Sequence, residues 1–349
     1  MKRITLLLIF VSSLTFAQEE KSSKMGQTTL EELKMTVYDK DSTASAVVLY
    51  EHANVYQDVN HDNNMRIDYY YRIKILDKNS FDLASIDINT YKKRRVINIK
   101  GITYNLTDAK TIRKSNLLDK NVFTTKEGKD WTVKKFTLPN IKEGSIIEYS
   151  YSIISPYLGI SDWYFQSDIP KVKSELDAAI LGNYKYNVRI TGFLKLDKDE
   201  PSVDKECVYI DGLDQGACSI YSYGMNDIPA FKEEDYMLSK KNYISHISFD
   251  LKSYTTSRGV IQNYTTTWKE ADKKLKKIFF NNQTSKTKFF KKNIPNNILA
   301  EENKLERAKN IYSFIQNHYS WNEEYWNNED EKVKDAFHSK IGSAGEINL

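Results

Sequence analysis

Apolar and polar residues alternate along three long stretches of this chain, and this alternation restricts the possible folds more than any other feature. In the clearest stretch, the apolar positions are Ile67, Tyr69, Tyr71, Ile73 and Ile75, with polar or amphipathic residues between them. The same period of two returns over residues 147–153 and 184–190. A period of two is typical of a strand with one buried face, so each stretch predicts a long β-strand.

Shorter strand signals fill most of the remaining sequence up to about residue 252. They lie at residues 85–88, 96–99, 131–136, 208–210, 219–223 and 246–251. Turn residues separate them, and helix-period segments are almost absent from this part. Many strands with turn punctuation favour two packed sheets, so we predict a large antiparallel β-sandwich over residues 45–252. Ahead of it, residues 18–44 form a polar lead-in, in which Thr29 and Glu32 predict a capping box and a short helix.

The pattern changes to that of helices over residues 253–349. Thr267 and Glu270 predict a capping box. The apolar stripe behind it consists of Trp268, Ala271, Leu275, Ile278 and Phe279. A second stripe consists of Leu305, Ala308, Ile311, Ile315 and Tyr319. An aromatic linker, Trp321 to Trp326, then leads to a short helical pattern that carries Val333, Ala336 and Phe337.

The first 17 residues have the three parts of a secretory signal peptide. Lys2 and Arg3 precede an apolar run over residues 4–11, and Ala17 supplies the small residue at a cleavage site before Gln18. The run is too short to span ~30 Å of hydrocarbon, and no later stretch approaches that length. We therefore expect an exported protein with no transmembrane segment after cleavage. The 51 basic and 47 acidic residues nearly balance, which gives no electrostatic reason to expect nucleic acid as a partner.

The chain has two cysteines, Cys207 and Cys218, separated by turn signals at residues 211–212 and 215–216. A hairpin there would bring the two sulfur atoms together in a disulfide; two separate small buried residues are equally compatible with the pattern. Neither cysteine stands at a helix start near a basic partner, so neither is expected to be a catalytic thiol. Two cysteines with scattered histidines do not form a zinc site either, and we expect no metal and no cofactor.

Three passages occur in an order that is more distinctive than any one of them. They are residues 136–149, with Pro139 and Gly144 before a long strand; Trp163–Pro170, an aromatic cluster; and Asn226–Glu234. In this order they resemble a family of domains of unknown function, number 3857. Its members lie directly ahead of transglutaminase-like domains in exported proteins of Gram-negative bacteria. The resemblance implies a location in the periplasm or at the cell surface.

The end of the chain resembles the first half of a transglutaminase-like (papain-like) core: helix, aromatic linker, helix, then a glycine-led turn into a new helix. The resemblance implies a nucleophilic cysteine two residues after Gly342, but Ala344 occupies that position. It also implies a histidine and an acid that would be expected beyond Leu349. Ser343 and Glu346 predict a capping box rather than a nucleophile. His318 and His338 lie upstream, and neither matches the family's base.

These observations favour an exported, non-catalytic binding or structural protein, with an unknown protein or glycan partner at the cell envelope. One alternative is that the chain is part of a longer acyl-transfer enzyme whose histidine and aspartate lie outside it. A second is a carbohydrate-binding sandwich, in which Trp163 and Phe165 would stack on sugars. Packing of these two aromatic residues in the core is the competing interpretation.

Overall fold

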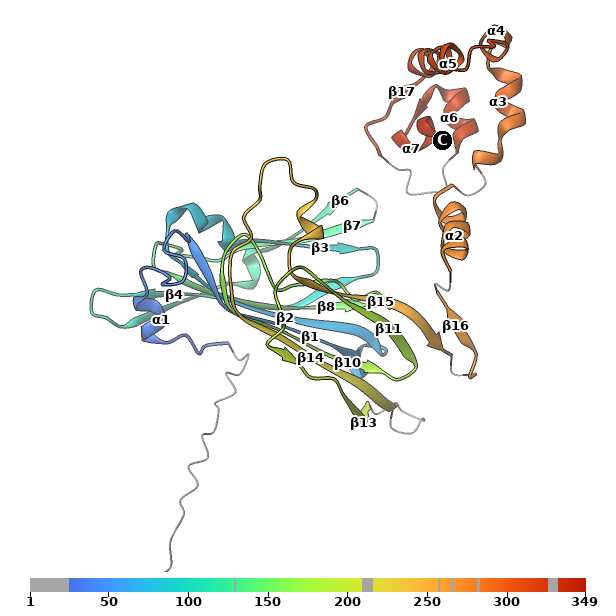
Figure 1. Ribbon diagram of the computed structural model, residues 1–349. Helices are drawn as coiled ribbons and strands as arrows, with labels where there is room; N and C mark the ends of the chain where they lie inside the picture. Colours follow the sequence, from blue (N-terminus) through green and yellow to red (C-terminus); the bar gives the residue numbers. More distant parts are fainter. Residues whose placement is uncertain are drawn as a thin grey trace, which may run out of the picture.

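The computed structural model describes residues 25–128, 130–208, 216–256, 258–264, 267–280, 283–325 and 332–349 (Figure 1). Its main element is a nine-stranded sheet in the order β12-β14-β10-β1-β2-β8-β4-β5, with β13 paired to β14. The strands of this sheet are β1 (Ala46–Asp58), β2 (Asn64–Ile75), β4 (Arg95–Leu106), β5 (Ile112–Asn116), β8 (Ile146–Ser155), β10 (Lys171–Leu181), β12 (Lys198–Asp199), β13 (Ser202–Val208) and β14 (Gly216–Ile228).

Two smaller sheets pack on one face of the large sheet. The first has the order β3-β7-β6, and the second has the order β11-β15-β16 with β9 paired to β15. Their strands are β3 (Ser85–Tyr91), β6 (Val122–Glu127), β7 (Trp131–Thr137), β9 (Trp163–Tyr164), β11 (Tyr184–Thr191), β15 (His246–Thr255) and β16 (Ile261–Asn263). The predicted strands therefore appear where the alternation placed them, except that residues 209 and 210 lie outside the described residues.

The expectation of a mainly β part followed by a smaller helical part is confirmed, but the large sheet is not wholly antiparallel. β1 and β10 run parallel, with Val48 opposite Lys171 and Val55 opposite Ala178. β10 follows β8, which runs in the same direction as β1, so residues 156–170 form a long crossover from the end of β8 to the start of β10. The crossover contributes β9 to the second small sheet, so it links the two layers of the sandwich. Alternation identifies a strand but carries no information about its direction.

The core lies on the inner face of the large sheet, in two clusters. One cluster, which includes Ile67, Leu176 and Met225, packs against the second small sheet through Ile247 and Phe249. The other, which includes Ile73 and Ile147, packs against β3 and β7 through Ile88 and Phe136. Tyr69, Tyr71, Tyr149 and Tyr151 stack between the two clusters. The odd-numbered positions of β2 thus form the inner face that their spacing predicted, but β2 is not buried on one face alone, because Tyr70, Arg72 and Lys74 are buried on the outer face.

Trp163 and Phe165, the candidate sugar platform, lie in this core. Trp163 is 5% exposed and Phe165 is fully buried. The indole Nε1 of Trp163 donates a hydrogen bond to the Ser174 hydroxyl at 3.1 Å. The crossover inserts both residues between the sheets, so neither ring is available at the surface for stacking on a sugar.

The outer face of the large sheet is covered at one end by the polar lead-in. Its helix α1 (Leu30–Lys34) starts with the predicted capping box, since Thr29 and Glu32 bond each other's backbone. Lys74 is fully buried below α1, and its ammonium donates to the carbonyl oxygens of Leu33 and Gly144, at 2.7 Å each. Two neutral carbonyls thus accept from this cation without neutralising its charge.

Glu148 anchors the same segment from the next strand. This buried carboxylate accepts hydrogen bonds from the hydroxyl groups of Tyr70 and Tyr104 and from the backbone N–H of Gly26, the last at 2.8 Å. Beside it, Arg72 lies 3.4 Å from Glu32 of α1. The lead-in is therefore attached to the sheet by buried polar contacts as well as by the apolar contacts of Leu33 and Tyr38.

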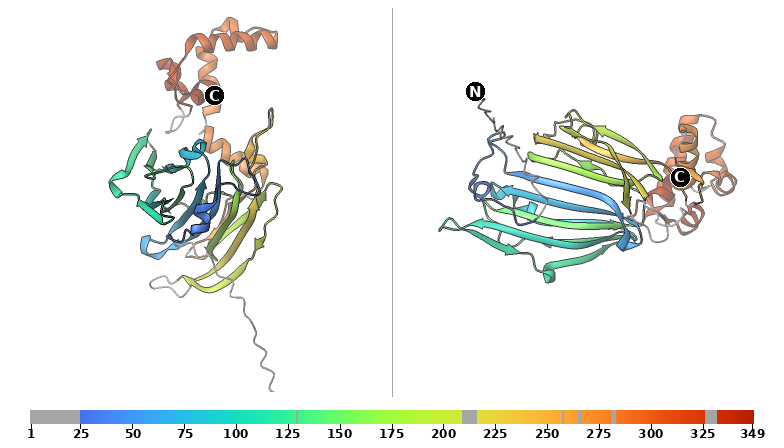
Figure 2. Two further views of the ribbon diagram at one scale, coloured as in Figure 1. Left: turned by 90° about the vertical axis from the view of Figure 1, so that its left-hand side faces the viewer. Right: turned by 90° about the horizontal axis from the view of Figure 1, so that it is seen from below.

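The helical part follows β16 and lies beyond the sheets (Figures 1 and 2). Its elements are α2 (Trp268–Phe280), α3 (Thr287–Asn293), α4 (Asn296–Leu299), α5 (Lys304–His318), β17 (Ser320–Trp321), α6 (Val333–Ser339), β18 (Ile341–Gly342) and α7 (Ala344–Asn348). β15 crosses the expected boundary at residue 252, and β16 pairs with its last residues, so the sheets reach Asn263. Within the described ranges, none of the helices combines the length and apolar character that a membrane span requires.

The burial of Trp163 gives a direct test of the core. We expect Trp163→Ala to lower the free energy of unfolding by about 3–5 kcal/mol, because it leaves a cavity and removes the partner of Ser174. Trp131→Ala, at a position 47% exposed on β7, should change it by less than about 1 kcal/mol. Chemical denaturation of both variants measures the difference. Equal effects would show that Trp163 does not stabilise the core.

Lys74 makes stability depend on pH. Burial lowers the pKa of Lys74 to about 8, although Glu32 raises it, whereas an unfolded lysine has a pKa of ~10.4. Between about pH 8 and pH 9.5 the unfolded chain binds more protons at this group, so its contribution to stability rises with pH, by at most about 1.4 kcal/mol per unit.

Lys74→Met removes this titration, so the wild-type stability should rise with pH relative to the variant in that window. Several buried tyrosines have a raised pKa in the fold, among them Tyr149 by burial. Their stabilisation is lost at higher pH in both proteins, so the difference between the two isolates Lys74. Denaturation curves at several pH values measure this difference. Parallel pH profiles would contradict the assignment.

Candidate functional site

The first residue of α7 is the position that the transglutaminase resemblance marks for a nucleophile. Ala344 begins this helix, and its backbone N–H donates to the carbonyl of Glu324 at 2.9 Å. The preceding Gly342 lies in β18, which pairs in parallel with β17. A β-carbon on Gly342 would stand 3.1 Å from that of Ala336, so glycine permits the close packing of α6 on this strand. The expected order of helix, aromatic linker, helix and glycine-led turn is present, although Trp326 lies outside the described residues.

Ser343 and Glu346 form the predicted capping box of α7. The Ser343 hydroxyl accepts from the Glu346 N–H at 3.1 Å, and a Glu346 carboxylate oxygen accepts from the Ser343 N–H at 3.0 Å. The other carboxylate oxygen accepts from the Lys332 N–H at 3.1 Å. The Ser343 hydroxyl is therefore buried and engaged in the cap, which is the role its spacing predicted.

Both histidines of the helical part pack against aromatic side chains. The ring of His318 lies 4.3 Å from that of Phe337, and its Nε2 donates to the Phe337 carbonyl at 2.9 Å. His338 is exposed and lies against Phe289. Because the Nε2 hydrogen of His318 is held by a carbonyl, that nitrogen has no free lone pair to act as a base.

A polar row that the sequence did not reveal crosses three strands on the outer face of the large sheet. His52 of β1 contacts one oxygen of Asp177 on β10, at 2.8 Å, and the Ser222 hydroxyl of β14 donates to the other oxygen. Tyr50 donates to Glu175 at 2.8 Å in the same row. These residues are far apart in the chain, and only the pairing register brings them together. Of these three strands, the sequence predicted only the part of β14 that carries Ser222, and it gave no signal for the association of the row.

This row contains the residue types of a serine hydrolase in a different geometry. Asp177 stands between Ser222 and His52, whereas a catalytic base must lie between the serine and the acid. Burial raises the pKa of Asp177, but hydrogen bonds from His52 and Ser222 outweigh it, so the net pKa is lowered. Asp177 therefore acts as an ionised acceptor that joins three strands, and Ser222 has no adjacent base in this arrangement.

Two of the three distinctive passages meet at one end of the sandwich. The N–H of Phe231 donates to the Ser167 carbonyl at 2.8 Å, and the Gln166 amide donates to the Pro229 carbonyl at 3.1 Å. Trp163–Pro170 and Asn226–Glu234 thus fix the segment that leads from β14 towards β15. Within that segment the acidic run at residues 233–235 serves partly as a connector, since Glu233 pairs with Lys240 at 2.9 Å. Across the described residues, no group of three or more histidine, cysteine or acidic side chains could hold a metal ion.

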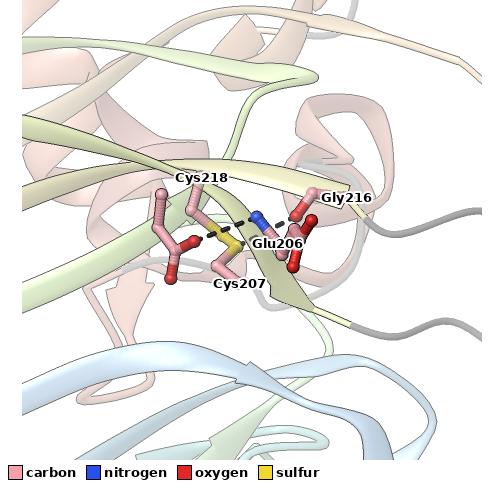
Figure 3. The surroundings of a disulfide bond; sticks show 5 residues. Glu206, Cys207, Gly216 and Cys218 are labelled. Carbon is pink, nitrogen blue, oxygen red and sulfur yellow. Dashed lines mark hydrogen bonds between the residues drawn. A yellow bond between two sulfur atoms is a disulfide. The ribbon is translucent and has the colours of Figure 1, made fainter.

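Cys207 of β13 and Cys218 of β14 are joined in a disulfide (Figure 3). Their Cα atoms lie 5.8 Å apart, within the range that a disulfide spans. Val203 and Asp204 of β13 pair with Ser219 and Cys218 of β14, so the bridge reinforces an existing strand pairing. This bond belongs to the edge of the large sheet, and the structure describes no free cysteine.

Comparisons with known proteins show the fold alone. No family model matches the chain, and no curated protein matches it. Among solved structures, a putative protease from Parabacteroides distasonis is similar, with a TM-score of 0.59 and 14% identity; the match covers 87% of this chain. The chain spans 57% of the length of that protein. A yeast LTA4 hydrolase matches with a TM-score of 0.26 and 13% identity, over 66% of this chain and 33% of its own, a likeness too weak to carry an argument.

Proposed function

We propose that this chain is an exported, non-catalytic protein that binds a partner at the cell envelope and retains the scaffold of a protease-like or transglutaminase-like domain. The observation that carries the proposal is Ala344 at the first position of α7. Thiol acyl transfer needs a sulfur nucleophile at that helix start, where the helix dipole favours the thiolate. A methyl group cannot attack a carbonyl carbon.

The hydroxyl and imidazole groups that the sequence singled out in the helical part add support, because they already have structural partners. Ser343 is held in the helix cap, and His318 is held by the Phe337 carbonyl. On the sandwich, Ser222 faces an acid rather than a base. The similarity to the Parabacteroides protein supports a shared scaffold, and the chemistry that protein performs is not transferred with it.

The proposal predicts that the wild-type chain neither hydrolyses casein nor couples a biotinylated amine to casein glutamine residues. It also predicts no acyl adduct, by mass spectrometry, with a chloromethyl ketone or an activated ester. Both cysteines are bridged, so the wild type should also resist alkylation by iodoacetamide.

Ala344→Cys supplies the missing sulfur and should be alkylated by iodoacetamide, at a rate at least about tenfold above Ala344→Ser, which differs from it by one atom. Turnover of casein or an acyl adduct on the wild-type chain would contradict the proposal. That outcome would favour an acyl-transfer enzyme instead.

Export predicts a defined N-terminus. Expressed in a Gram-negative host, the periplasmic protein should begin at Gln18, because Ala17 supplies the small residue that signal peptidase requires. Ala17→Arg should block cleavage and leave the longer chain in the membrane fraction. Intact mass measurement distinguishes the two, and a soluble wild-type chain that starts at Met1 would contradict export.

A further inference from the structure

A cleft lined by aromatic side chains lies beside the junction of the two distinctive passages. Its volume is about 460 Å³, within the range of ligand sites. Two segments form it, the turn after β11 and the connection between β14 and β15. The lining residues are Phe193, Phe231, Lys232, Glu234, Asp235, Tyr236, Met237 and Tyr243.

The aromatic residues at the rim of this cleft point into solvent. Phe193 is 86% exposed, Tyr236 is fully exposed, and Leu238 next to the cleft is also exposed. Phe231 and Tyr243 are half-buried and form its floor. Single exposed apolar residues are ordinary, but a group of them around a hollow marks a binding surface.

The backbone holds Tyr236 in an unfavourable conformation. Its φ is +64°, in the left-handed region that a bulky residue rarely adopts. It lies in a turn closed by a hydrogen bond from the Met237 N–H to the Glu234 carbonyl at 3.3 Å. A fully exposed ring gains no packing within the chain to offset this strain. Strained backbone of this kind clusters at ligand clamps and active sites, which points to a binding role for this turn.

The cleft is held from both sides, so it exists before a ligand binds. Gly192 has a φ of +100°, and a β-carbon there would stand 2.4 Å from the Ser245 hydroxyl, so only glycine permits the turn that presents Phe193. On the other side, Lys240 pairs with Glu233 and Asp168. A preformed site loses less conformational entropy when it binds.

We infer that this cleft binds an extended peptide segment of a partner protein, one that places an apolar side chain between the aromatic rings and a lysine or arginine beside it. Phenylalanine, tyrosine and methionine are the residues enriched in protein interfaces, and methionine adapts to varied apolar side chains. Glu234 and Asp235 form no ion pair with any described residue, so they are available to a basic side chain. The single cation, Lys232, leaves the rim net acidic.

This inference deepens the proposed binding role, but its test does not involve Ala344. The probe is an array of immobilised hexapeptides with a central Leu, Phe or Met, flanked by Lys or Arg, by Ser, or by Glu. The wild-type chain should bind the basic set at least about tenfold more tightly than the acidic set. Phe193→Ala should weaken this binding at least about tenfold. The matched control is Phe123→Ala, at a position 61% exposed on β6, and it should bind as the wild type does.

Two further variants separate ligand recognition from folding. Glu234→Lys with Asp235→Lys should invert the preference towards acidic peptides without lowering the melting temperature. Tyr236→Gly should raise the melting temperature by about 2–4 °C, because it relieves the left-handed strain, and yet weaken peptide binding. Binding that ignores peptide charge or survives Phe193→Ala would overturn the inference. Failure to bind any of the peptides would also overturn the inference, whether or not the chain binds a glycan array. Catalysis by the wild type would overturn the proposed function and leave this result standing.

Discussion

The fold depends on a buried ion pair between the two parallel strands at the centre of the large sheet. The Lys171 ammonium lies 2.6 Å from a Glu51 carboxylate oxygen, and each side chain is 5% exposed. Ser174 donates to the same oxygen, and Lys171 also donates to the Tyr164 carbonyl of the crossover. Removing one partner of such a pair costs about 3–5 kcal/mol, because it leaves a buried charge without compensation. A one-residue slip of β10 would turn Lys171 to the opposite face, so the pair fixes the register as well as the crossover.

The outer face of the large sheet also holds buried charged side chains whose polar partners fix neighbouring segments. Lys74 and Glu148 are both fully buried there, and each is satisfied mainly by groups other than an opposite charge. Their partners include the Leu33 carbonyl and the Gly26 N–H, which belong to the lead-in. The segment ahead of the first strand is therefore part of the folded unit, because without it two buried charged groups would lose partners.

Local features were predictable from the sequence, and features that depend on register were not. Alternation identified β2, β8 and β11 but not the equally long β10. The Thr29 and Ser343 capping boxes were correctly predicted because each involves residues three apart. The parallel pairing and the row of His52, Asp177 and Ser222 depend on which strands become neighbours. Alternation also cannot mark a buried charge such as Glu51, because an acid on the inner face reads as a break in the pattern. The sequence favoured core packing for Trp163 over a sugar platform but could not show its exposure, which the crossover decides by placing it between the sheets.

The helix cap explains how the end of this chain can keep its architecture without a thiol. Backbone donors at the start of α7 are satisfied by Ser343 and Glu346, and the carbonyls of Glu324 and Tyr325 bind the N–H groups of Ala344 and Gly345. None of these contacts uses the side chain of residue 344. The helix start is thus stable whether that position carries a sulfur or a hydrogen, so the nucleophile can be absent at no structural cost. By contrast, the side chain of Tyr236 is fully exposed although its backbone is strained. The helix start at Ala344, where acyl transfer would occur, is therefore held by internal contacts. The exposed aromatic residues Phe193 and Tyr236 lie instead on loops of the sandwich, and loops on a rigid scaffold usually carry recognition.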